Sequence, residues 1–199
     1  TLLAYVRRPK YLARQYLFVV SPGVVSTMAL VVPEAAPQPL TVLTEEESMF
    51  RDTVRQFAEE TIAPRVHAMD AAAQMDPDLI PQLFELGLMG IEIPEMWGGA
   101  GSSFFNSGLV VEELSRVDPS VGVLVDVQNT LVNNFVLRWG TDELKAAYLP
   151  RLASSAVGSY ALSEAGSGSD AFAMQARAFD DRDAWRLEGR KLWITNGAE

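Results

Sequence analysis

Cysteine is absent from the 199 residues of this chain, and histidine occurs once, at position 67. Without cysteine the chain forms no disulfide and offers no thiolate to a metal ion. A lone histidine excludes a histidine cluster for zinc, and we interpret His67 as a solvated helix residue rather than half of a Ser-His catalytic pair. These absences exclude thiol catalysis and argue against zinc enzymes and triad hydrolases.

Basic residues are scarce. The chain has 16 Lys and Arg but 26 Asp and Glu, which gives a formal net charge of -10. Arg7, Arg8, Lys10 and Arg14 all precede the first acidic residue, Glu34, so the body that follows is more acidic still. An acidic body without a basic stripe repels phosphate backbones, and we expect no nucleic-acid partner. A hydrophobic share of 48% with 21% charged residues is typical of a folded globular protein.

Residues 1–32 contain no acidic residue but several basic residues, serines and threonines. This composition is typical of a mitochondrial targeting segment, which forms a basic amphipathic helix. Two alternatives stay open: a secretory signal, because residues 17–20 are apolar behind basic residues, or a short membrane anchor that continues to Val32. Ser21, Pro22 and Gly23 interrupt the apolar run, and this break is costly in a lone lipid-facing helix. We therefore favour targeting to the mitochondrial matrix and expect no membrane span.

A proline-rich linker completes a first region, residues 1–40, and a helical region is predicted over residues 41–154. Thr44 followed by Glu47 is a capping box, and apolar residues then repeat at helical spacing up to Pro64, which predicts one amphipathic helix. Asp76 opens a second helix, which Gly87 ends. Residues 91–101 contain a proline and three glycines, which predicts a tight surface loop.

Three further helices are predicted over residues 109–117, 121–136 and 142–152, which makes an all-α lobe of five helices. The segment 121–136 is apolar around most of its circumference and should be buried inside the bundle. Asp126, Gln128, Asn129 and Thr130 interrupt it with polar groups. Buried polar side chains need partners, so they either pair inside the bundle, which is the simpler expectation, or face a ligand cavity.

After Pro150 the pattern changes to short β-compatible runs, and residues 155–199 are predicted to be the first part of an antiparallel β-domain. Strands are expected over residues 156–163, 172–179, 184–188 and 191–195, with a hairpin loop over 180–183. The fold class is therefore α+β, with a cleft where the two lobes meet.

A loop rich in glycine and serine follows the first predicted strand. Glycines let the backbone approach a ligand, and serine hydroxyls with consecutive N–H groups can bind phosphate oxygens without a positive charge. Such a loop between strands is usually only a turn, so this stretch alone leaves both interpretations open.

The complete motif is more specific. Leu162-Ser163-Glu164-x-x-Ser167-Gly168-Ser169-Asp170, followed by Lys191-x-Trp193-Ile194-Thr195-Asn196, resembles the paired signatures of acyl-CoA dehydrogenases. The resemblance runs from about residue 43 to residue 199, and residues 112–114, 118–121 and 127–131 look most like the short/branched-chain members. Ser167 stands where many members have alanine; a small side chain is kept, so we expect little effect.

The resemblance implies FAD as the cofactor. It assigns the first signature to the flavin ring and to the pyrophosphate. Leu162 and Ser163 would hydrogen-bond the pyrimidine edge of the flavin, with Tyr160 and Ala161 on the same strand. The helix over residues 121–130 looks like the one that lines the acyl pocket of the family.

The resemblance assigns the remaining cofactor contacts to the glycine loop and the second signature. Gly168 and Ser169 would approach the FAD pyrophosphate, and Ser169 would also touch the pantetheine arm of acyl-CoA. Trp193 would stack beside the isoalloxazine, the backbone of Trp193 and Ile194 would bond its C4 carbonyl, and the Thr195 hydroxyl would reach N5.

Simpler interpretations exist for several of these residues. Trp193 could be ordinary core, because an aromatic residue in a β-run usually is. Glu164 and Asp170 are expected to be structural carboxylates that cap the loop through backbone N–H bonds.

The resemblance also implies a reaction: a carboxylate removes the α-proton of an acyl thioester while the β-hydride passes to the flavin, which yields a trans-2-enoyl-CoA. The base of the family lies in a carboxy-terminal helical domain, expected beyond Glu199, so no catalytic residue is named here and the isolated chain is expected to be inactive. Electron-transferring flavoprotein would accept the electrons, and the full-length protein would be a homotetramer. An acyl-CoA oxidase or flavin monooxygenase of the same fold, or a non-catalytic helical interaction module, are the alternatives.

Overall fold

The computed structural model describes residues 4–7, 39 and 42–197. The described chain divides into two compact units. The helical unit comprises Leu43–Met174 together with Lys191–Glu199, and the hairpin unit comprises Gln175–Arg190 together with the described residues before Leu43. The predicted division at residues 40 and 154 stays a prediction.

The first helix is longer than predicted, because the chain stays helical through Pro64. It consists of α1 (Glu45–Phe57), the π-helical η1 (Ala58–Ile62) and α2 (Ala63–Ala72). The capping box is confirmed: Glu47 N–H donates to Thr44 Oγ1 at 3.1 Å, and Thr44 N–H donates to Glu47 Oε2 at 2.8 Å. Pro64 falls in the first turn of α2, directly after the wider π turn, where a missing N–H costs little.

The second helix, α3 (Leu79–Glu85), begins and ends close to the predicted signals. The Asp76 carboxylate accepts from the N–H of Asp78 at 3.0 Å, just before the first turn. Gly87 has φ of +72°, and the next N–H, of Leu88, donates to Leu83 O at 2.9 Å. Glycine reaches this left-handed conformation without a Cβ clash, so it can end the helix here.

Residues 91–101 form more than a surface loop, and that prediction is wrong in part. Ile91 and Ile93 have exposed fractions of 1% and 0% and belong to the hydrophobic core. A short 3-10 helix, η2 (Glu95–Trp97), follows. Gly99 lies so close to this segment that a Cβ there would come within 2.1 Å of Ile93 O. The apolar residues between the turn signals therefore anchor the loop to the bundle.

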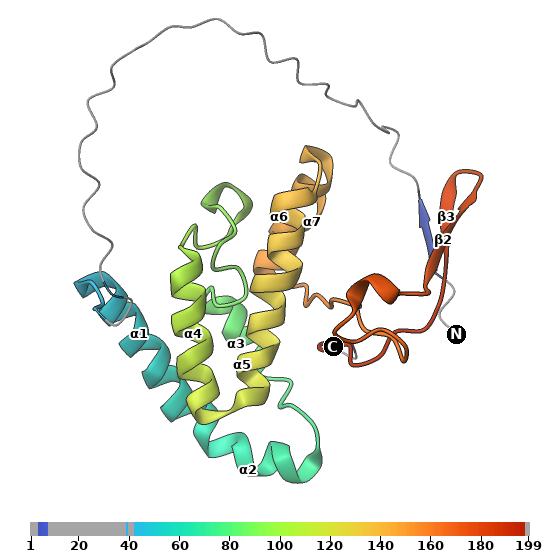
Figure 1. The fold of residues 1–199 in the computed structure, drawn as a ribbon. Helices are drawn as coiled ribbons and strands as arrows, with labels where there is room; N and C mark the ends of the chain where they lie inside the picture. Colours follow the sequence, from blue (N-terminus) through green and yellow to red (C-terminus); the bar gives the residue numbers. More distant parts are fainter. Residues whose placement is uncertain (1–3, 8–38, 40–41, 198–199) are drawn as a thin grey trace, which may run out of the picture. The chain divides into compact units, whose positions relative to one another are not determined.

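The three remaining predicted helices are confirmed, with longer bounds. They are α4 (Phe104–Val117), a composite helix of α5 (Pro119–Asp126), the π-helical η3 (Val127–Asn133) and α6 (Asn134–Trp139), and finally α7 (Asp142–Ser154). Asp118 and Thr141 accept backbone N–H bonds at the starts of α5 and α7. In Figure 1, α4 and the composite helix lie side by side.

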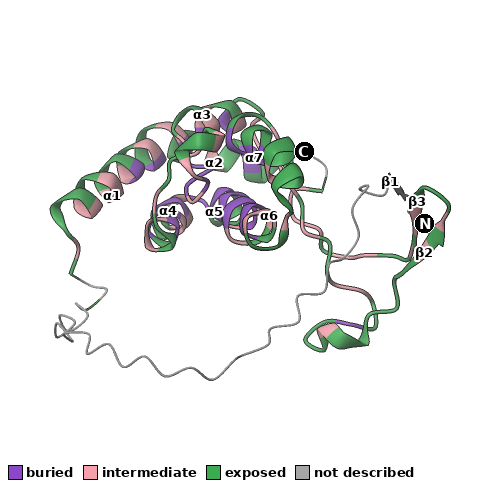
Figure 2. Cartoon of the chain, turned by 90° about the horizontal axis from the view of Figure 1, so that it is seen from above, coloured by how far each residue is buried: buried purple, intermediate pink, exposed green. Residues whose placement is uncertain are grey.

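The helical unit buries two clusters of apolar residues between these helices. Figure 2 shows the buried residues on the facing sides of α4 and α5. Of the run predicted to be buried, Val121, Leu124, Val125 and Val127 are buried, whereas Val123 is 45% exposed. Each fully buried aliphatic side chain contributes roughly 1.5–3 kcal/mol. The core also contains residues from the first helix, α3 and the loop that follows it, among them Val54, Ala58, Ile62, Leu79, Leu83, Leu88 and Met89.

The polar residues of the composite helix pair inside the bundle, as the simpler expectation had it. Asn129 is 1% exposed. Its Oδ1 accepts from Ile91 N–H at 2.9 Å, and its Nδ2 donates to Leu88 O at 2.8 Å and Val125 O at 3.0 Å. The Thr130 hydroxyl donates to the Asp126 backbone and carboxylate, both at 2.9 Å. These bonds fix the loop after α3 against the composite helix.

An ion pair joins α1 to α4. Arg55 Nε and Nη2 donate to the two carboxylate oxygens of Glu113 at 2.9 and 2.7 Å, and Arg116 Nε donates at 3.3 Å. The Glu113 side chain is 4% exposed. The hydrogen bonds from Arg55 lower the pKa of Glu113 below its ordinary value, although burial of the carboxylate opposes this shift.

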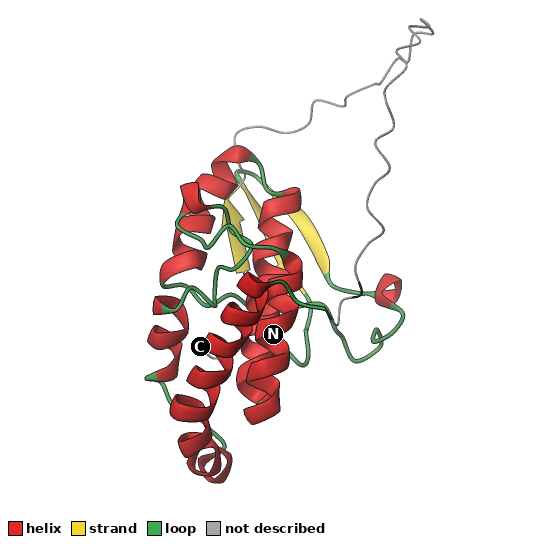
Figure 3. Cartoon of the chain, turned by 90° about the vertical axis from the view of Figure 1, so that its left-hand side faces the viewer, coloured by secondary structure: helices red, strands yellow, loops and turns green. Residues whose placement is uncertain are grey.

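The hairpin unit contains a three-stranded antiparallel sheet in the order β1-β3-β2, drawn yellow in Figure 3. Its strands are β1 (Ala4–Arg7), β2 (Arg177–Asp181) and β3 (Ala184–Glu188). The predicted strand over 184–188 is confirmed. The predicted loop over 180–183 is shorter, because Asp181 pairs with Ala184 and only Arg182 and Asp183 remain in the turn.

The predicted strand over 172–179 is confirmed from residue 177, where β2 begins, and the other strand predictions are wrong. Residues 172–176 begin with a 3-10 turn, η4 (Ala171–Ala173), because the Asp170 carboxylate accepts from Phe172 N–H. Residues 156–163 and 191–195 contain no strand. A strand requires a ladder of backbone bonds, and the one backbone bond between these two segments among the described residues runs from Leu192 to Ser163. The positive φ of Trp193 also breaks extended geometry.

Within the predicted leader, Ala4–Arg7 is a strand rather than a helix, since it pairs with β3 from Ala4 opposite Leu187 to Arg7 opposite Ala184. The other leader residues lie outside the described residues. In the part of the chain that is described, no helix is long and apolar enough to cross a membrane.

The bonds of Asn129 predict a large loss of stability on substitution. Asn129→Leu should lower the free energy of unfolding by about 2 kcal/mol or more, because it leaves the buried N–H of Ile91 and the carbonyl of Leu88 without partners. Urea denaturation of the purified chain measures this. Gln56→Ala, at an exposed position on α1, should change stability by less than about 0.5 kcal/mol. Equal effects of the two substitutions would contradict the prediction.

The lowered pKa of Glu113 predicts a pH-dependent contribution. A carboxylate whose pKa is depressed in the folded state stabilises the fold fully above its unfolded-state pKa, about 4.3, and loses this contribution as the pH falls through the folded-state value. The stability difference between the unmodified chain and Glu113→Gln should therefore be largest near pH 7 and shrink below about pH 4.3. Denaturation at several pH values tests this, and a difference that stays constant down to the acid transition would count against it.

Candidate functional site

The two signature segments lie next to each other in the helical unit. Leu192 N–H donates to Ser163 O at 2.8 Å. Lys191 Nζ donates to Leu162 O at 2.9 Å and to Glu164 Oε1 at 2.8 Å. Segments far apart in the sequence are therefore joined by both backbone and side-chain bonds. The arrangement brings the predicted pyrimidine-edge residues beside the segment that carries the predicted isoalloxazine contacts.

The glycine loop is closed by its own bonds. Glu164 and Ser167 exchange backbone hydrogen bonds at 3.0 and 3.1 Å. Ser167, the departure from the family pattern, is 2% exposed, and its hydroxyl donates to Asp170 O at 2.7 Å. The Asp170 carboxylate in turn accepts from Phe172 N–H at 3.2 Å. Asp170 thus has the structural capping role that the sequence suggested.

Gly168 and Ser169 are exposed and lie between Ser167 and Asp170, after the Glu164–Ser167 bridge. Among the described residues, neither backbone N–H donates to a protein acceptor. Two adjacent N–H groups without internal partners, on a loop closed from both sides, can bind the oxygens of a phosphate. The loop therefore fits the pyrophosphate that the resemblance assigns to it.

The predicted ring-binding residues form an accessible surface. Trp193 is 90% exposed and has φ of +57°, so it is not a core residue. A bulky residue at positive φ is an outlier, and such backbone strain concentrates at functional sites. Ile194 and Thr195 next to it are half-buried, as is Ser163. An exposed aromatic ring beside hydroxyl and backbone groups suits a flat heteroaromatic ligand.

The residues at the start of the first signature and just before it border the helical bundle. The Tyr160 ring meets the Phe135 ring edge to face, with 6.1 Å between centroids and 65° between planes. Ala161 and Leu162 are exposed. Tyr160 therefore holds the start of the segment against α6, while the two following side chains stay accessible.

Lys191 is the one cation among the residues of the two signatures, and it is paired. Lys191, 21% exposed at its side chain, pairs with Glu164, 8% exposed. The positive charge of Lys191 is therefore neutralised by Glu164, and a phosphate at the loop would be bound by N–H groups and hydroxyls. No cluster of acidic and histidine side chains that could hold a metal ion occurs in the described ranges.

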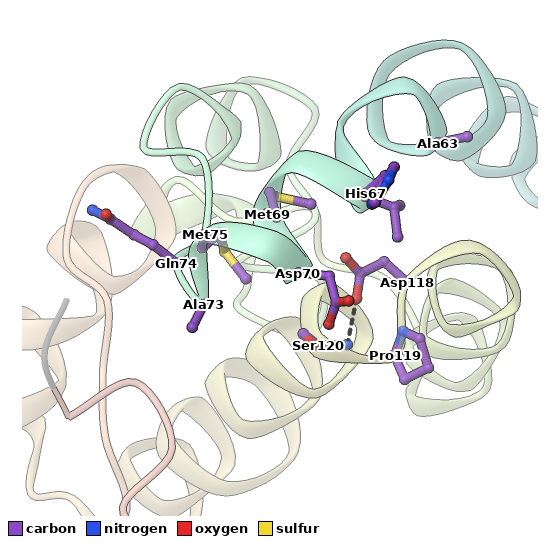
Figure 4. A pocket seen from close by; sticks show the side chains of 11 residues that line it. Ala63, His67, Met69, Asp70, Ala73, Gln74, Met75, Asp118, Pro119 and Ser120 are labelled. Carbon is purple, nitrogen blue, oxygen red and sulfur yellow. Dashed lines mark hydrogen bonds between the residues drawn. The ribbon is translucent and has the colours of Figure 1, made fainter.

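A cavity of about 710 Å³ lies elsewhere, between α2 and the start of α5. Figure 4 shows His67, Asp70 and Asp118 at its wall, with the Asp118 carboxylate bonded to Ser120 N–H at 2.8 Å. His67 and Asp70 are exposed, and the Asp118 carboxylate caps α5. The expectation of a solvated His67 therefore agrees with its position, and no predicted site residue lines this cavity.

Two residues that had no assigned role connect the signatures to the bundle. Asn196 closes the second signature, and its carbonyl accepts from the Ser159 hydroxyl at 2.7 Å. Gln128, on η3, contacts the segment before the first signature through its side-chain amide. The polar interruption of an apolar helix was the available signal for Gln128, but the sequence did not show which segment it would bind.

The family description "Acyl-CoA dehydrogenase, N-terminal domain" matches residues 44–156. A probable short/branched chain specific acyl-CoA dehydrogenase of Dictyostelium discoideum is 47% identical over 163 residues, which are 81% of this chain and 40% of that protein. The mitochondrial short/branched chain specific acyl-CoA dehydrogenase of Bos taurus is 48% identical over 158 residues, 79% of this chain and 37% of that protein.

The fold is also similar to that of a solved acyl-CoA dehydrogenase structure. The structure of a glutaryl-CoA dehydrogenase from Mycobacterium smegmatis in complex with FADH2 matches with a TM-score of 0.74 and 35% identity, over 78% of this chain and 40% of that chain. This chain thus spans about two fifths of the length of its relatives. The predicted likeness to short/branched-chain members is confirmed, as is the α+β fold class, and the chain belongs to the acyl-CoA dehydrogenase family.

Proposed function

We propose that this chain is the amino-terminal part of a flavoprotein that oxidises short or branched-chain acyl-CoA to trans-2-enoyl-CoA with FAD. One observation carries the proposal: the Leu192–Ser163 backbone bond at 2.8 Å joins the two signature segments that would share one flavin. Family membership supports the same reaction class.

The flavin contacts are proposed residue by residue. Leu162 and Ser163 would bond the pyrimidine edge, with Tyr160 and Ala161 beside them. On the adjoining segment, Trp193 would stack beside the ring system. The exposure of Trp193, Ala161 and Leu162 supports this arrangement, because a ligand can reach all three.

The remaining contacts complete the cofactor and substrate surfaces. The backbone of Trp193 and Ile194 would bond the C4 carbonyl, and the Thr195 hydroxyl would reach N5. The unpaired N–H groups of Gly168 and Ser169 would bind the pyrophosphate, and Ser169 would also touch the pantetheine arm of acyl-CoA. Val123, 45% exposed on the composite helix, supports an acyl pocket over residues 121–130.

Bound FAD would supply the acceptor for the substrate hydride. The protein groups described here would hold the ring and the thioester in register and keep water from the reacting carbons. No residue of this chain is proposed as the base that removes the α-proton; we place that base beyond Glu199. Electron-transferring flavoprotein as acceptor, a homotetramer and a mitochondrial matrix location belong to the same proposal, the last supported by the mitochondrial relative.

A chimera tests the function. Residues 44–197 would replace the matching segment of the Bos taurus relative, and the purified protein should retain bound FAD and oxidise 2-methylbutyryl-CoA with an artificial electron acceptor. Trp193→Ala in the chimera should weaken FAD retention at least tenfold, because stacking on the ring is lost. A folded chimera without a flavin spectrum would support a non-catalytic helical module instead, and stoichiometric peroxide release would favour an oxidase.

The isolated chain gives a second prediction. The 199 residues alone, incubated with FAD and either butyryl-CoA or 2-methylbutyryl-CoA, should show weak flavin binding and no turnover, because the proposed base is not among them. Absorbance of the artificial acceptor measures the reaction, with the bovine relative as the positive control. Measurable turnover by the purified chain would refute the placement of the base.

A further inference from the structure

The backbone N–H and the backbone carbonyl of Gly158 are both hydrogen-bonded to side chains. Its N–H donates to Gln128 Oε1 at 2.7 Å, and its carbonyl accepts from Asn196 Nδ2 at 3.2 Å. Gln128 belongs to η3 of the bundle, whereas Asn196 belongs to the end of the second signature. A short stretch of backbone thus links the helical bundle to the second signature, immediately before the first signature begins.

On the side of the bundle, the Gln128 side chain is held by further hydrogen bonds. Gln128 is 0% exposed, and its Nε2 donates to Leu152 O and Ala156 O, both at 3.0 Å. Both ends of the side-chain amide are therefore bonded to backbone. Because an unpaired amide in a core is costly, Gln128 has little freedom to release Gly158.

On the side of the second signature, Asn196 makes several hydrogen bonds of its own. Asn196 has φ of +61°, a left-handed conformation that asparagine and glycine tolerate best. Its Nδ2 also donates to Leu124 O on α5 at 3.2 Å, and its own carbonyl accepts from Ser159 Oγ at 2.7 Å. One residue therefore contacts α5, the segment before the first signature, and the first residue after Gly158.

The π-helical η3 follows directly after the bonded part of α5. Leu124 O accepts from Asn196, and the next carbonyl, of Val125, accepts from the Asn129 side chain at 3.0 Å. Side-chain donors inserted beside a helix ladder accompany local distortions of this kind, and π-bulges occur often at functional sites. The distorted helix thus offers its carbonyls to the segment that docks on it.

Close packing fixes the same position. A Cβ added to Gly158 would lie 2.4 Å from Val132 Cγ1 and 3.1 Å from Val132 Cβ. Real Cβ atoms do not approach a branched side chain so closely. Glycine lets the backbone come near enough to η3 for the Gln128 bond to form.

We propose that Gln128, Gly158 and Asn196 form a clamp that positions both signature segments on the α5–η3 helix, with Asn196 as a positioning residue of the flavin site. The claim that Asn196 positions the flavin site rests on the proposed function. Asn196 follows Thr195 directly, and Gly158 lies two residues before Tyr160, so the clamp holds the end of the second signature and the segment that leads into the first.

Amide hydrogen exchange of the 199-residue chain tests the clamp without any cofactor. Asn196→Gly keeps the left-handed backbone accessible but removes the side-chain bonds, and it should speed exchange of the Leu192 and Gly158 amides at least tenfold. Asn196→Asp should do the same, because it places a carboxylate against two carbonyls. Ser159→Ala removes a single bond and should have a smaller effect.

The matched control is Gln82→Ala, which removes another side-chain amide bonded to one backbone carbonyl, Asp78 O at 2.7 Å. It should leave exchange at Leu192 and Gly158 unchanged, and α4 amides should be unaffected in every variant. Unchanged exchange at Leu192 and Gly158 in both Asn196 variants would overturn the clamp.

The flavin arm uses the chimera. There, Asn196→Gly should weaken FAD binding at least fivefold, while Gln82→Ala should not. If Asn196→Gly speeds exchange but FAD binds as tightly as before, the positioning role is overturned. If the parent chimera folds but holds no FAD, the proposed function fails, and the exchange experiment still decides whether the clamp exists.

Discussion

Hydrogen bonds from buried side-chain amides of the composite helix to the backbone of other segments hold the helical unit in register. Gln128, Asn129 and Asn133 are 0%, 1% and 0% exposed, and each donates to a backbone carbonyl of another segment. Aliphatic packing is the larger favourable contribution, but it is not directional. The amides add direction, because a shifted loop would leave them unpaired in the core. They thereby select one arrangement of the loop after α3 and of the segment after α7.

This dependence links the core to the site. Asn129 and Asn133 fix the loop after α3 to one side of the composite helix, and Gln128 fixes the segment after α7 to another. The signature segments then dock on surfaces that are already set. The ion pair of Arg55 with Glu113 stabilises the other end of the bundle, between α1 and α4, and has no contact with the site.

Much of the helical unit could be predicted because its signals are local. The capping box at Thr44, the stop at Gly87 and the apolar period of the composite helix each act within a few residues of the feature they specify. The prediction ended the first helix before Pro64. The chain stays helical there because the wider π turn of η1 directly precedes the turn that contains the proline. The burial of Ile91 and Ile93 was missed because it depends on partners distant along the chain: Asn129 bonds Ile91, and Leu149 packs in one cluster with Ile93. The predictions of strands over residues 156–163 and 191–195 failed for the same reason, since strand pairing is set by partners distant in sequence. The family signatures were recognisable, whereas the side chains that hold them in place were not.

The pairing of Lys191 with Glu164 has a consequence for how an anionic cofactor would arrive. In a chain with a formal net charge of -10, a loop without an uncompensated cation exerts no long-range pull on a dinucleotide. Capture would then depend on short-range geometry, and because the acidic chain repels an anion, the association rate would be slow and would rise with ionic strength. A protein built in this way gains selectivity against other polyanions, since a ligand must match the direction of the N–H groups before it is retained.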